Sequence, residues 1–167
     1  MQKYLFQTKR LGFRFLKETD LDYVAALNRD PDVRQFFPDG VQDRKQTQER
    51  MNDFMSFYKE KGLPCFLMFE LETDNFVGRC GFGPIDTGEI EVGYLLHKIF
   101  WGKGYASEAL MFLLEWAKEN IQAEYIIAFA PVEHLASARV MKKCGMKHYK
   151  NDNAKGVACC FYRIKNP

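Results

Sequence analysis

Alternating hydrophobic and polar side chains predict the first strand of the fold. Over residues 9–17, Leu11, Phe13 and Phe15 recur with period two, and polar or small residues separate them. This spacing is typical of a strand that buries one face. Hydrophobic runs bounded by turn residues predict the other strands over residues 65–71, 76–82, 89–96, 125–130, 146–150 and 157–164. We therefore expect a sheet at the centre of the fold.

Hydrophobic residues at helical spacing predict two long helices. In residues 105–119, Leu110, Leu113 and other hydrophobic residues recur every three or four positions, with charged residues on the opposite side. Residues 43–61 carry a similar stripe, and Gly62 follows as a residue that readily ends a helix. The first of these segments is the best defined helix of the chain.

Two shorter helices are also expected. Thr19 or Asp20 would cap the first, which runs to about Asn28, because the side-chain oxygens of such residues accept hydrogen bonds from free backbone N–H groups. The second runs over about 134–143, and Gly145 is suited to a left-handed C-cap.

The order of the predicted elements, β-α-α-β-β-β-α-β-α-β-β, shows no internal repeat. Its strand–helix–strand core favours a right-handed crossover between parallel neighbours. The fold class is therefore α/β with a central mixed sheet flanked by helices. Nothing in the 167 residues reads as a linker, so residues 1–167 are expected to form a single domain.

Composition narrows the range of partners. Hydrophobic residues make up 47% of the chain and charged residues 28%, which is typical of a folded globular domain. A net charge of +2 gives no support to nucleic-acid binding. The chain shows neither the apolar run of a signal peptide nor a stretch of about 20 apolar residues that would span a membrane. Five cysteines without a CxxC pair favour reduced thiols and a cytoplasmic location, namely Cys65, Cys80, Cys144, Cys159 and Cys160.

A glycine-containing turn, residues 97–104, joins a predicted strand directly to the best defined helix. Gly102 and Gly104 leave the backbone accessible, and the N–H groups at a helix N-terminus favour a phosphate or pyrophosphate. The simpler alternative is a tight turn whose helix is capped by Ser107 and Glu108. The segment matches neither GxGxxG nor GxxxxGK[ST], which argues against a nucleotide-binding module.

Three segments give the sequence a resemblance to the GNAT acetyltransferases, in particular to the branch of the ribosomal-protein N-terminal acetyltransferases. The resemblance spans almost the whole chain. The segments are RLGFRFL at 10–16 followed by Asp20, EVGYLL at 91–96 continuing to WGKGYASEAL at 101–110, and HLASAR at 134–139 continuing to CGM at 144–146. The middle segment is the most specific of the three.

This resemblance implies a GNAT acyl-CoA N-acyltransferase fold and an enzyme that transfers acetyl from acetyl-CoA, its co-substrate, to a primary amine. It also implies that the glycine turn holds the coenzyme A pyrophosphate. The preceding strand would offer backbone groups to pantetheine and to the thioester carbonyl, where an N–H would stabilise the developing oxyanion. The residues so implied in cofactor binding are Leu95, Leu96, Trp101, Gly102, Lys103, Gly104, Tyr105, Ala106, Ser107, His134 and Ser137.

The sequence departs from the family pattern at three positions. Trp101 stands where much of the superfamily has Gln or Arg, a replacement familiar in the ribosomal-protein branch. His134 stands where Asn is common, and would either orient pantetheine or be an ordinary capping or surface residue. Met141 replaces a Tyr that protonates the departing thiolate in many members. Ser137 matches a serine of the ribosomal-protein branch and is either the proton donor or a small residue packed near the cofactor.

Glu89 and Glu91 are the candidate bases. They alternate with Ile90 and Val92, so both carboxylates should lie on the same side of the strand before the glycine turn. We prefer Glu91, the alternative being that this side is only an exposed polar face. An α-amino group, with a pKa of about 7.7–8.0, needs less help from a base than a lysine side chain at about 10.4. We expect direct attack by the amine, without a covalent acyl-enzyme or a metal ion.

The sequence leaves the acceptor open. The leading hypothesis is a protein N-terminus, as in the ribosomal-protein branch, and the nearest alternative is a small amine such as a polyamine, an antibiotic or an amino-acid derivative. Because of Met141, a non-catalytic acyl-CoA-binding domain is a further alternative. A polycationic acceptor would need clustered acids, for which the chain offers Asp30, Asp32, Asp39 and Asp43.

Residues 36–38, an aromatic segment, lie where related enzymes often shape the acceptor site. Neither a nucleic acid nor a membrane is an expected partner, and the chain is expected to be a monomer or a homodimer.

Overall fold

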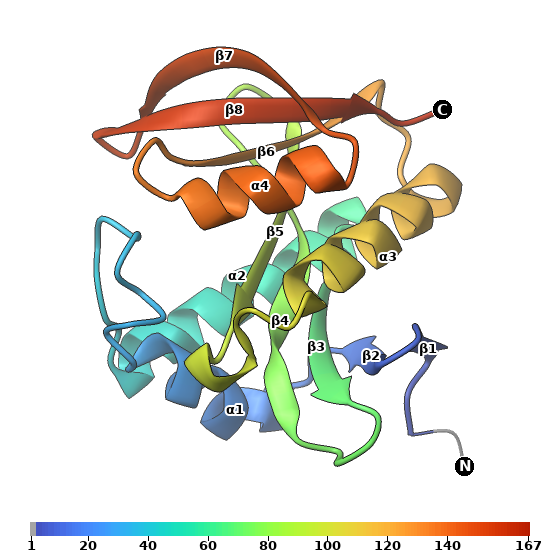
Figure 1. Cartoon of the computed structure of the whole chain (residues 1–167). Coiled ribbons are helices and arrows are strands. Elements are labelled where there is room, and N and C mark those ends of the chain that lie inside the picture. The colour runs from blue at the N-terminus through green and yellow to red at the C-terminus, as the bar shows by residue number, and fades with distance from the viewer. Residues whose placement is uncertain (1–2) are drawn as a thin grey trace.

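The computed structural model describes residues 3–167 as a central sheet with helices on both faces (Figure 1). The strands are β1 (Phe6–Gln7), β2 (Leu11–Phe15), β3 (Cys65–Glu70), β4 (Phe76–Pro84), β5 (Ile90–Leu96), β6 (Tyr125–Pro131), β7 (Lys147–Ala154) and β8 (Val157–Lys165). The helices are α1 (Leu21–Asn28), α2 (Arg44–Lys61), α3 (Tyr105–Asn120) and α4 (Leu135–Lys143), with short 3-10 turns at Glu18–Asp20 and Lys98–Phe100. The mixed α/β class predicted from the sequence is confirmed.

The sheet has the order β1-β2-β3-β4-β5-β6-β8-β7. All neighbouring strands are antiparallel except β5 and β6, which are parallel and are connected by α3. This is the strand–helix–strand crossover that the sequence predicts. The ladder between β5 and β6 is short, because only Ile90 pairs with Ile126 and Glu91 with Ile127. Beyond Glu91 the two strands separate, and Figure 1 shows β6–β8 turned strongly relative to β3–β5.

Strand β3 explains why its sequence is continuously apolar rather than alternating. Phe66 and Met68 belong to the core cluster that α3 covers, whereas Leu67 and Phe69 belong to the cluster under α1 and α2. A strand buried on both faces has no polar side to present. In Figure 1, α3 crosses in front of these strands and α2 lies behind them.

The helix ends mostly follow the sequence signals. Asp43 caps α2 and forms a capping box with Gln46, and Gly62 ends the helix at a φ of 69°. Gly145 adopts the expected left-handed conformation after α4, with a φ of 91°. Asp20 is the exception: it occupies the N-cap position of α1, but its side chain makes no capping bond.

The Asp20 carboxylate binds the Arg14 guanidinium instead. Both carboxylate oxygens accept hydrogen bonds, at 2.8 and 2.9 Å, and one of them also accepts the backbone N–H of Lys17. The capping role expected of Thr19 or Asp20 is therefore wrong, because the charged partner on β2 takes the carboxylate. The bond holds the start of α1 to β2.

Two parts of the sheet were not predicted. Strand β1 has only two residues, too few for any periodicity. Strand β7 extends to Ala154 rather than ending near residue 150, although the sequence KHYKNDNA is polar and mostly exposed. Its pairing with β8 determines its extended conformation. Within residues 3–167, no helix is long and apolar enough to cross a membrane.

Candidate active site

The turn before α3 presents a row of free backbone N–H groups. Gly102 and Gly104 adopt left-handed conformations, with φ of 75° and 83°, and Gly104 is the N-cap of the helix. The first helical hydrogen bond runs from the N–H of Glu108 to the carbonyl of Gly104. Within residues 3–167, the N–H groups of residues 102–107 have no hydrogen-bond partner. Such a row at the positive end of a helix dipole favours a phosphate group.

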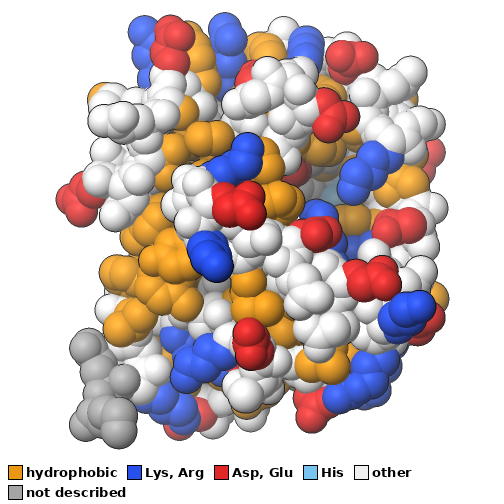
Figure 2. Space-filling model, turned by 180° about the vertical axis from the view of Figure 1, so that it is seen from behind, with side chains coloured by type: hydrophobic (Ala, Val, Ile, Leu, Met, Phe, Trp, Pro, Cys, Tyr) orange, Lys and Arg blue, Asp and Glu red, His pale blue; other side chains and the backbone are white. Residues whose placement is uncertain are grey.

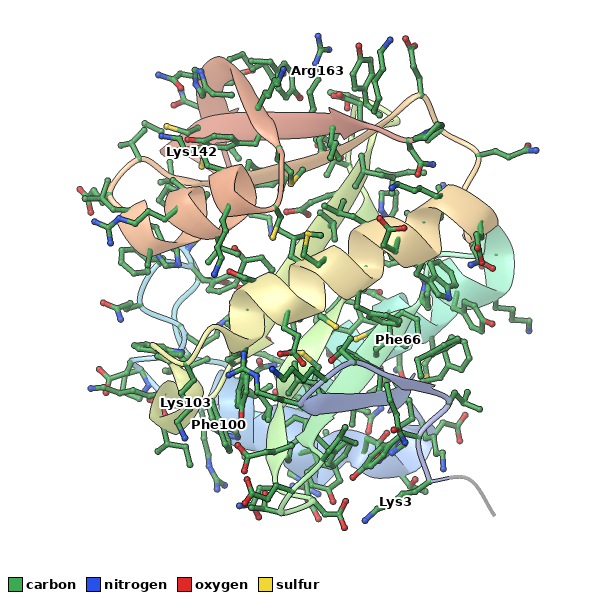
Figure 3. All side chains as sticks on the ribbon, turned by 45° about the vertical axis from the view of Figure 1, so that its right-hand side comes forward. Lys3, Phe66, Phe100, Lys103, Lys142 and Arg163 are labelled. Atoms are coloured by element: carbon green, nitrogen blue, oxygen red, sulfur yellow. The ribbon has the colours of Figure 1, made fainter. Side chains whose placement is uncertain are left out.

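Arg10 holds this turn in place from β2's side of the sheet. Its Nη1 donates to the carbonyl of Lys103 at 2.7 Å, and its Nε donates to the Glu108 carboxylate at 2.8 Å. Glu108 also accepts the backbone N–H of Arg10 and the hydroxyl of Thr8. These bonds fix the peptide between Lys103 and Gly104. In Figure 3, Lys103 lies with Phe100 at the N-terminal end of α3, whereas Lys142 lies apart on α4.

The side chains of the turn serve the protein interior more than a ligand. Tyr105 and Ser107 are buried, and the Tyr105 hydroxyl donates to Glu70. The Trp101 indole N–H donates to the carbonyl of Leu96 at 3.0 Å. At this turn, the predicted cofactor residues would therefore contact a ligand through their backbone rather than through their side chains.

Strand β5 has a free edge where it separates from β6. The N–H of His97 donates to the carbonyl of Val77 on β4, so by alternation the backbone of Leu95 faces β4 and the backbones of Tyr94 and Leu96 face the gap. The Leu96 carbonyl on that edge already accepts the Trp101 bond. The structure thus separates the two leucines that the sequence treats together.

A pair of hydroxyl groups lies across this gap. The hydroxyl of Tyr94 on β5 and that of Ser137 on α4 share a hydrogen bond of 3.0 Å. Burial raises the pKa of Tyr94 to about 12, so its proton stays on the oxygen at neutral pH. Met141, one turn further along α4, is buried and offers no proton. Sequence reasoning missed Tyr94 as a site residue. Its position three residues after Glu91 on a predicted strand already places its side chain on the opposite face of β5 from Glu91.

The two candidate carboxylates differ in environment. Burial raises the pKa of Glu91 to about 7, against a smaller lowering effect of Lys155, Arg50 and Arg79. Glu89 lies just before β5, where its carboxylate accepts hydrogen bonds from Thr87 at 2.8 Å and from Tyr149 at 3.4 Å. Burial thereby brings the Glu91 carboxyl to the proton affinity of a general base at neutral pH.

His134 lies at the start of α4, facing the loop between α1 and α2. Its ring stacks on Phe36, with the ring centres 4.0 Å apart and the planes 8° apart. Burial lowers its pKa, so the imidazole is neutral at pH 7. The fold therefore brings Phe36, from the aromatic segment 36–38, into contact with His134, although the two residues lie far apart in the sequence.

Solved structures share this architecture. An acetyltransferase of the GNAT family from Bacillus anthracis aligns with a TM-score of 0.79 at 25% identity, covering 96% of this chain and 97% of that one. Two structures at 16% identity show the same fold. One is the spermidine N-acetyltransferase of Vibrio cholerae in complex with CoA and spermine, with a TM-score of 0.79 over 95% and 97% of the two chains. The other is an acetyltransferase from Salmonella typhimurium that modifies the N-terminal serine of ribosomal protein L7/L12, with a TM-score of 0.80 over 95% and 96%.

Sequence relatives cover most of the chain. The uncharacterised protein YkkB of Bacillus subtilis is 31% identical over 147 residues, 86% of this chain and 85% of its own. The uncharacterised N-acetyltransferase p20 of Bacillus licheniformis is 32% identical over 141 residues, 80% and 77% of the two chains. The family model described as the Acetyltransferase (GNAT) domain matches residues 10–147. The chain therefore belongs to the GNAT family of N-acetyltransferases.

Proposed function

We propose that this enzyme transfers an acetyl group from acetyl-CoA to an α-amino group, with a protein or peptide N-terminus as the first choice of acceptor. The observation that carries the proposal is the arrangement around β5. Glu91 lies on one face of the strand and the Tyr94–Ser137 pair on the other, where β5 leaves β6. A base and a proton donor thus flank one free strand edge.

The residues present fit acetyl-CoA. The unpartnered N–H groups of residues 102–107 suit the pyrophosphate, and the adjacent Lys103 adds a positive charge. The free edge of β5 at Tyr94 and Leu96 suits the amide groups of the pantetheine arm, which would add to the strand by backbone hydrogen bonds. When bound, acetyl-CoA supplies the acetyl group as a thioester.

The free edge and Glu91 would act on the two reacting groups. A backbone N–H of the β5 edge would donate to the thioester carbonyl oxygen, where negative charge develops. Glu91 would accept a proton from the attacking amine, directly or through a water molecule. With a pKa of about 7, its carboxylate is close to the 7.7–8.0 of an α-amino group and far from the 10.4 of a lysine side chain. An α-amino acceptor therefore suits this base best.

The Tyr94–Ser137 pair would protonate the departing thiolate. Ser137 is the closer analogue of the serine in the ribosomal-protein branch, and Tyr94 would hold its hydroxyl in position and replenish its proton. His134, neutral and stacked on Phe36, would line the passage between pantetheine and the acceptor. Glu89 would have a structural role in the turn before β5.

The proposal is tested by thiol release from acetyl-CoA with three acceptors. These are a peptide with a free N-terminus and no lysine, a lysine peptide with a blocked N-terminus, and spermidine. We expect acceptor-dependent release with the first, after subtraction of the signal from the protein's own cysteines. Release only with the lysine peptide or spermidine would exclude the α-amino preference. Calorimetric binding of acetyl-CoA without release for any acceptor would indicate a non-catalytic binding domain instead.

A further inference from the structure

Arg79 lies on the same face of the sheet as Glu91. The β4–β5 register pairs Arg79 with Leu95, Gly81 with Gly93 and Gly83 with Glu91, and paired residues of antiparallel strands point to one side. The Gly81–Gly93 pair therefore separates the two charged residues. Gly83 lies opposite Glu91 and four positions along β4 from Arg79. The backbone positions of Arg79 and Glu91 are therefore about 13 Å apart along the strand direction.

The Arg79 guanidinium has no anionic partner within residues 3–167. Its Nε is buried and has no hydrogen-bond partner, and the contact made by the group is with the Phe54 ring of α2, 4.9 Å from the ring centre. Burial lowers the pKa of Arg79 to about 10, so it remains charged at neutral pH. A half-buried cation whose buried Nε has no partner loses hydration, and a bound carboxylate would offset that loss.

Other cations lie near Arg79 or Glu91. The Arg50 guanidinium lies 4.7 Å from the centre of the same Phe54 ring, and its nearest carboxylate, Asp53, is 3.8 Å away on the exposed side of α2. The positive charge of Lys155, at the tip of the β7–β8 hairpin, also lowers the pKa of Glu91. The charged groups that act on the Glu91 carboxyl are thus all positive.

The four aspartates that the sequence offers to a polycationic acceptor are already engaged. Asp39 binds Arg34 at 2.9 Å and Asp32 binds Lys98 at 3.0 Å. Asp43 caps α2, and Asp30 accepts the backbone N–H of Asp32. They form pairs and turns rather than an acidic cleft. A polyamine would therefore meet Arg50, Arg79 and Lys155 without a cluster of free carboxylates to offset them.

Open space lies above the strand surface beside Glu91. A Cβ added to Gly83 or to Gly93 would have no heavy atom within 4 Å. The space-filling view from behind shows the molecule hollowed on its right-hand side, above the middle, with basic and acidic side chains at the rim (Figure 2). A small group can therefore lie over Gly83 and Gly93 beside Glu91, whereas the space at Gly81, nearer to Arg79, is filled by backbone atoms of Pro64 and Cys65.

We propose that the acceptor carries a carboxylate in addition to its amine, and that Arg79, assisted by Arg50, binds this carboxylate while Glu91 receives the proton of the amine. The inference deepens the proposed function and rests on it. The shared chemistry is an α-amino group with a carboxylate a few bonds away. A free amino acid or amino-acid derivative offers this, and so does a peptide whose first or second residue is acidic.

Matched probes that differ only in charge test the inference. One pair consists of two peptides that differ only in their first residue, which is aspartate in one and asparagine in the other. The small-molecule pair consists of free glutamate and the derivative in which both the α-carboxylate and the side-chain carboxylate are amides. We expect kcat/KM at least about tenfold higher for the charged member of one pair, which also identifies the source of the carboxylate. Calorimetric binding of the N-acetylated forms of the same probes gives a second readout that needs no turnover.

The preference should depend on the two arginines. Arg79→Gln and Arg50→Gln should remove most of it by raising KM for the charged probe, whereas Arg79→Lys should keep part of it. Arg44→Gln is the matched control, because Arg44 lies on the same helix as Arg50 but pairs with Asp22 on the exposed surface. Arg50 is the more exposed of the two arginines, so the Arg50 variant keeps the test usable if loss of Arg79 prevents folding.

Two results separate this inference from the proposed function. Equal turnover and equal product binding for the charged and neutral members of both pairs would overturn the inference and leave α-amino acetylation intact. A preference for the neutral members or for spermidine would overturn it as well. Absence of both acetyl-CoA binding and thiol release would instead overturn the proposed function.

Discussion

Burial separates two glutamates that stand two positions apart. Glu89 binds Thr87 and Tyr149 near the surface, whereas the Glu91 carboxylate makes no hydrogen bond within residues 3–167 and its pKa rises to about 7. Desolvation is the largest cause of the rise, because a carboxylate that is removed from water loses hydration. The same residue type thus acquires a base's proton affinity from its surroundings.

Glu91→Gln should lower kcat/KM by about a hundredfold at pH 7, the lower end of the usual range for a general base. In the unchanged enzyme, kcat/KM should rise as pH increases through about 7, where Glu91 loses its proton. The variant should lose this inflection and keep only the rise that the acceptor's own amine contributes at about 7.7–8.0. Full pH–rate profiles with one α-amino acceptor measure the effect, and Glu89→Gln should retain the inflection. A normal profile in Glu91→Gln would remove Glu91 from the mechanism.

The same variant has a stability readout. A folded pKa above the unfolded value of about 4.3 means that the native state holds this proton more tightly. The resulting stabilisation is complete below about pH 4 and is lost as pH rises through about 7. Melting temperatures at pH 5 and pH 8 should therefore show Glu91→Gln gaining on the unchanged protein at the higher pH. No such gain would mean that Glu91 is better hydrated than its position indicates.

Several residues of the candidate site were within reach of sequence reasoning, and others were not. The glycine turn and the shared side of Glu89 and Glu91 follow from spacing along one chain segment. The role proposed for Arg79 does not, because its neighbours Phe54 and Arg50 belong to α2 and come together with β4 only in the folded chain. Pairing across elements decides burial, and burial decides which charges we propose to be functional.

The element that we propose to hold the coenzyme phosphates is the turn leading into α3. Its two glycines have φ values near +80°, a conformation that costs other residues about 1–2 kcal/mol. Nothing lies within 4 Å of a Cβ added to Gly102, so a side chain there would meet no protein atom. Any loss of coenzyme affinity would then come from contact with the ligand or from altered backbone geometry.

Gly102→Ala should raise KM for acetyl-CoA by about tenfold and lower the melting temperature by several degrees. Gly62→Ala is the matched control, since Gly62 also has a positive φ, of 69°, and an open surrounding, but ends α2 away from the turn. The control should lose similar stability with an unchanged KM. Equal KM values for both variants would place the coenzyme phosphates elsewhere.

Most elements were predictable because each carries its own pattern. Helices α2 and α3 and strands β3–β6 show hydrophobic periodicity, caps or bounding turns in the sequence. Strand β7 lacks such a pattern beyond residue 150 and is extended because β8 pairs with it. Local sequence therefore defines the elements that contact the core, and partner strands define the remainder.

At the scale of the whole molecule, the sheet consists of two parts held together at a short junction. Strands β5 and β6 share only the pairs at Glu91 and Ile90, and α3 connects the parts through the core. The sequence indicates the crossover, but not the separation of the strands after Glu91 or the position of β8 between β6 and β7. Both features depend on the twist of the assembled sheet.

Coenzyme A should stabilise the native state by bridging this junction. At a hundred times its Kd, a ligand that binds only the folded state contributes about 2.7 kcal/mol, which corresponds to a rise of about 5–10 °C in melting temperature. Hydrogen exchange should slow in residues 92–96 and 102–107. Pantetheine, which lacks the pyrophosphate, should protect the first segment with a smaller thermal shift. Equal effects of both ligands would argue against a phosphate role for the turn.

The bonds from Thr8 and Arg10 to Glu108 join residues about a hundred positions apart. During synthesis, the N-terminal residues leave the ribosome long before the helix that they hold, so the turn acquires its final shape only after the sheet edge has docked. If the turn holds the coenzyme as proposed, coenzyme affinity is a property of the completed fold and not of the loop sequence. A preparation that binds coenzyme A normally has, by that fact, both ends of this long connection in their native places.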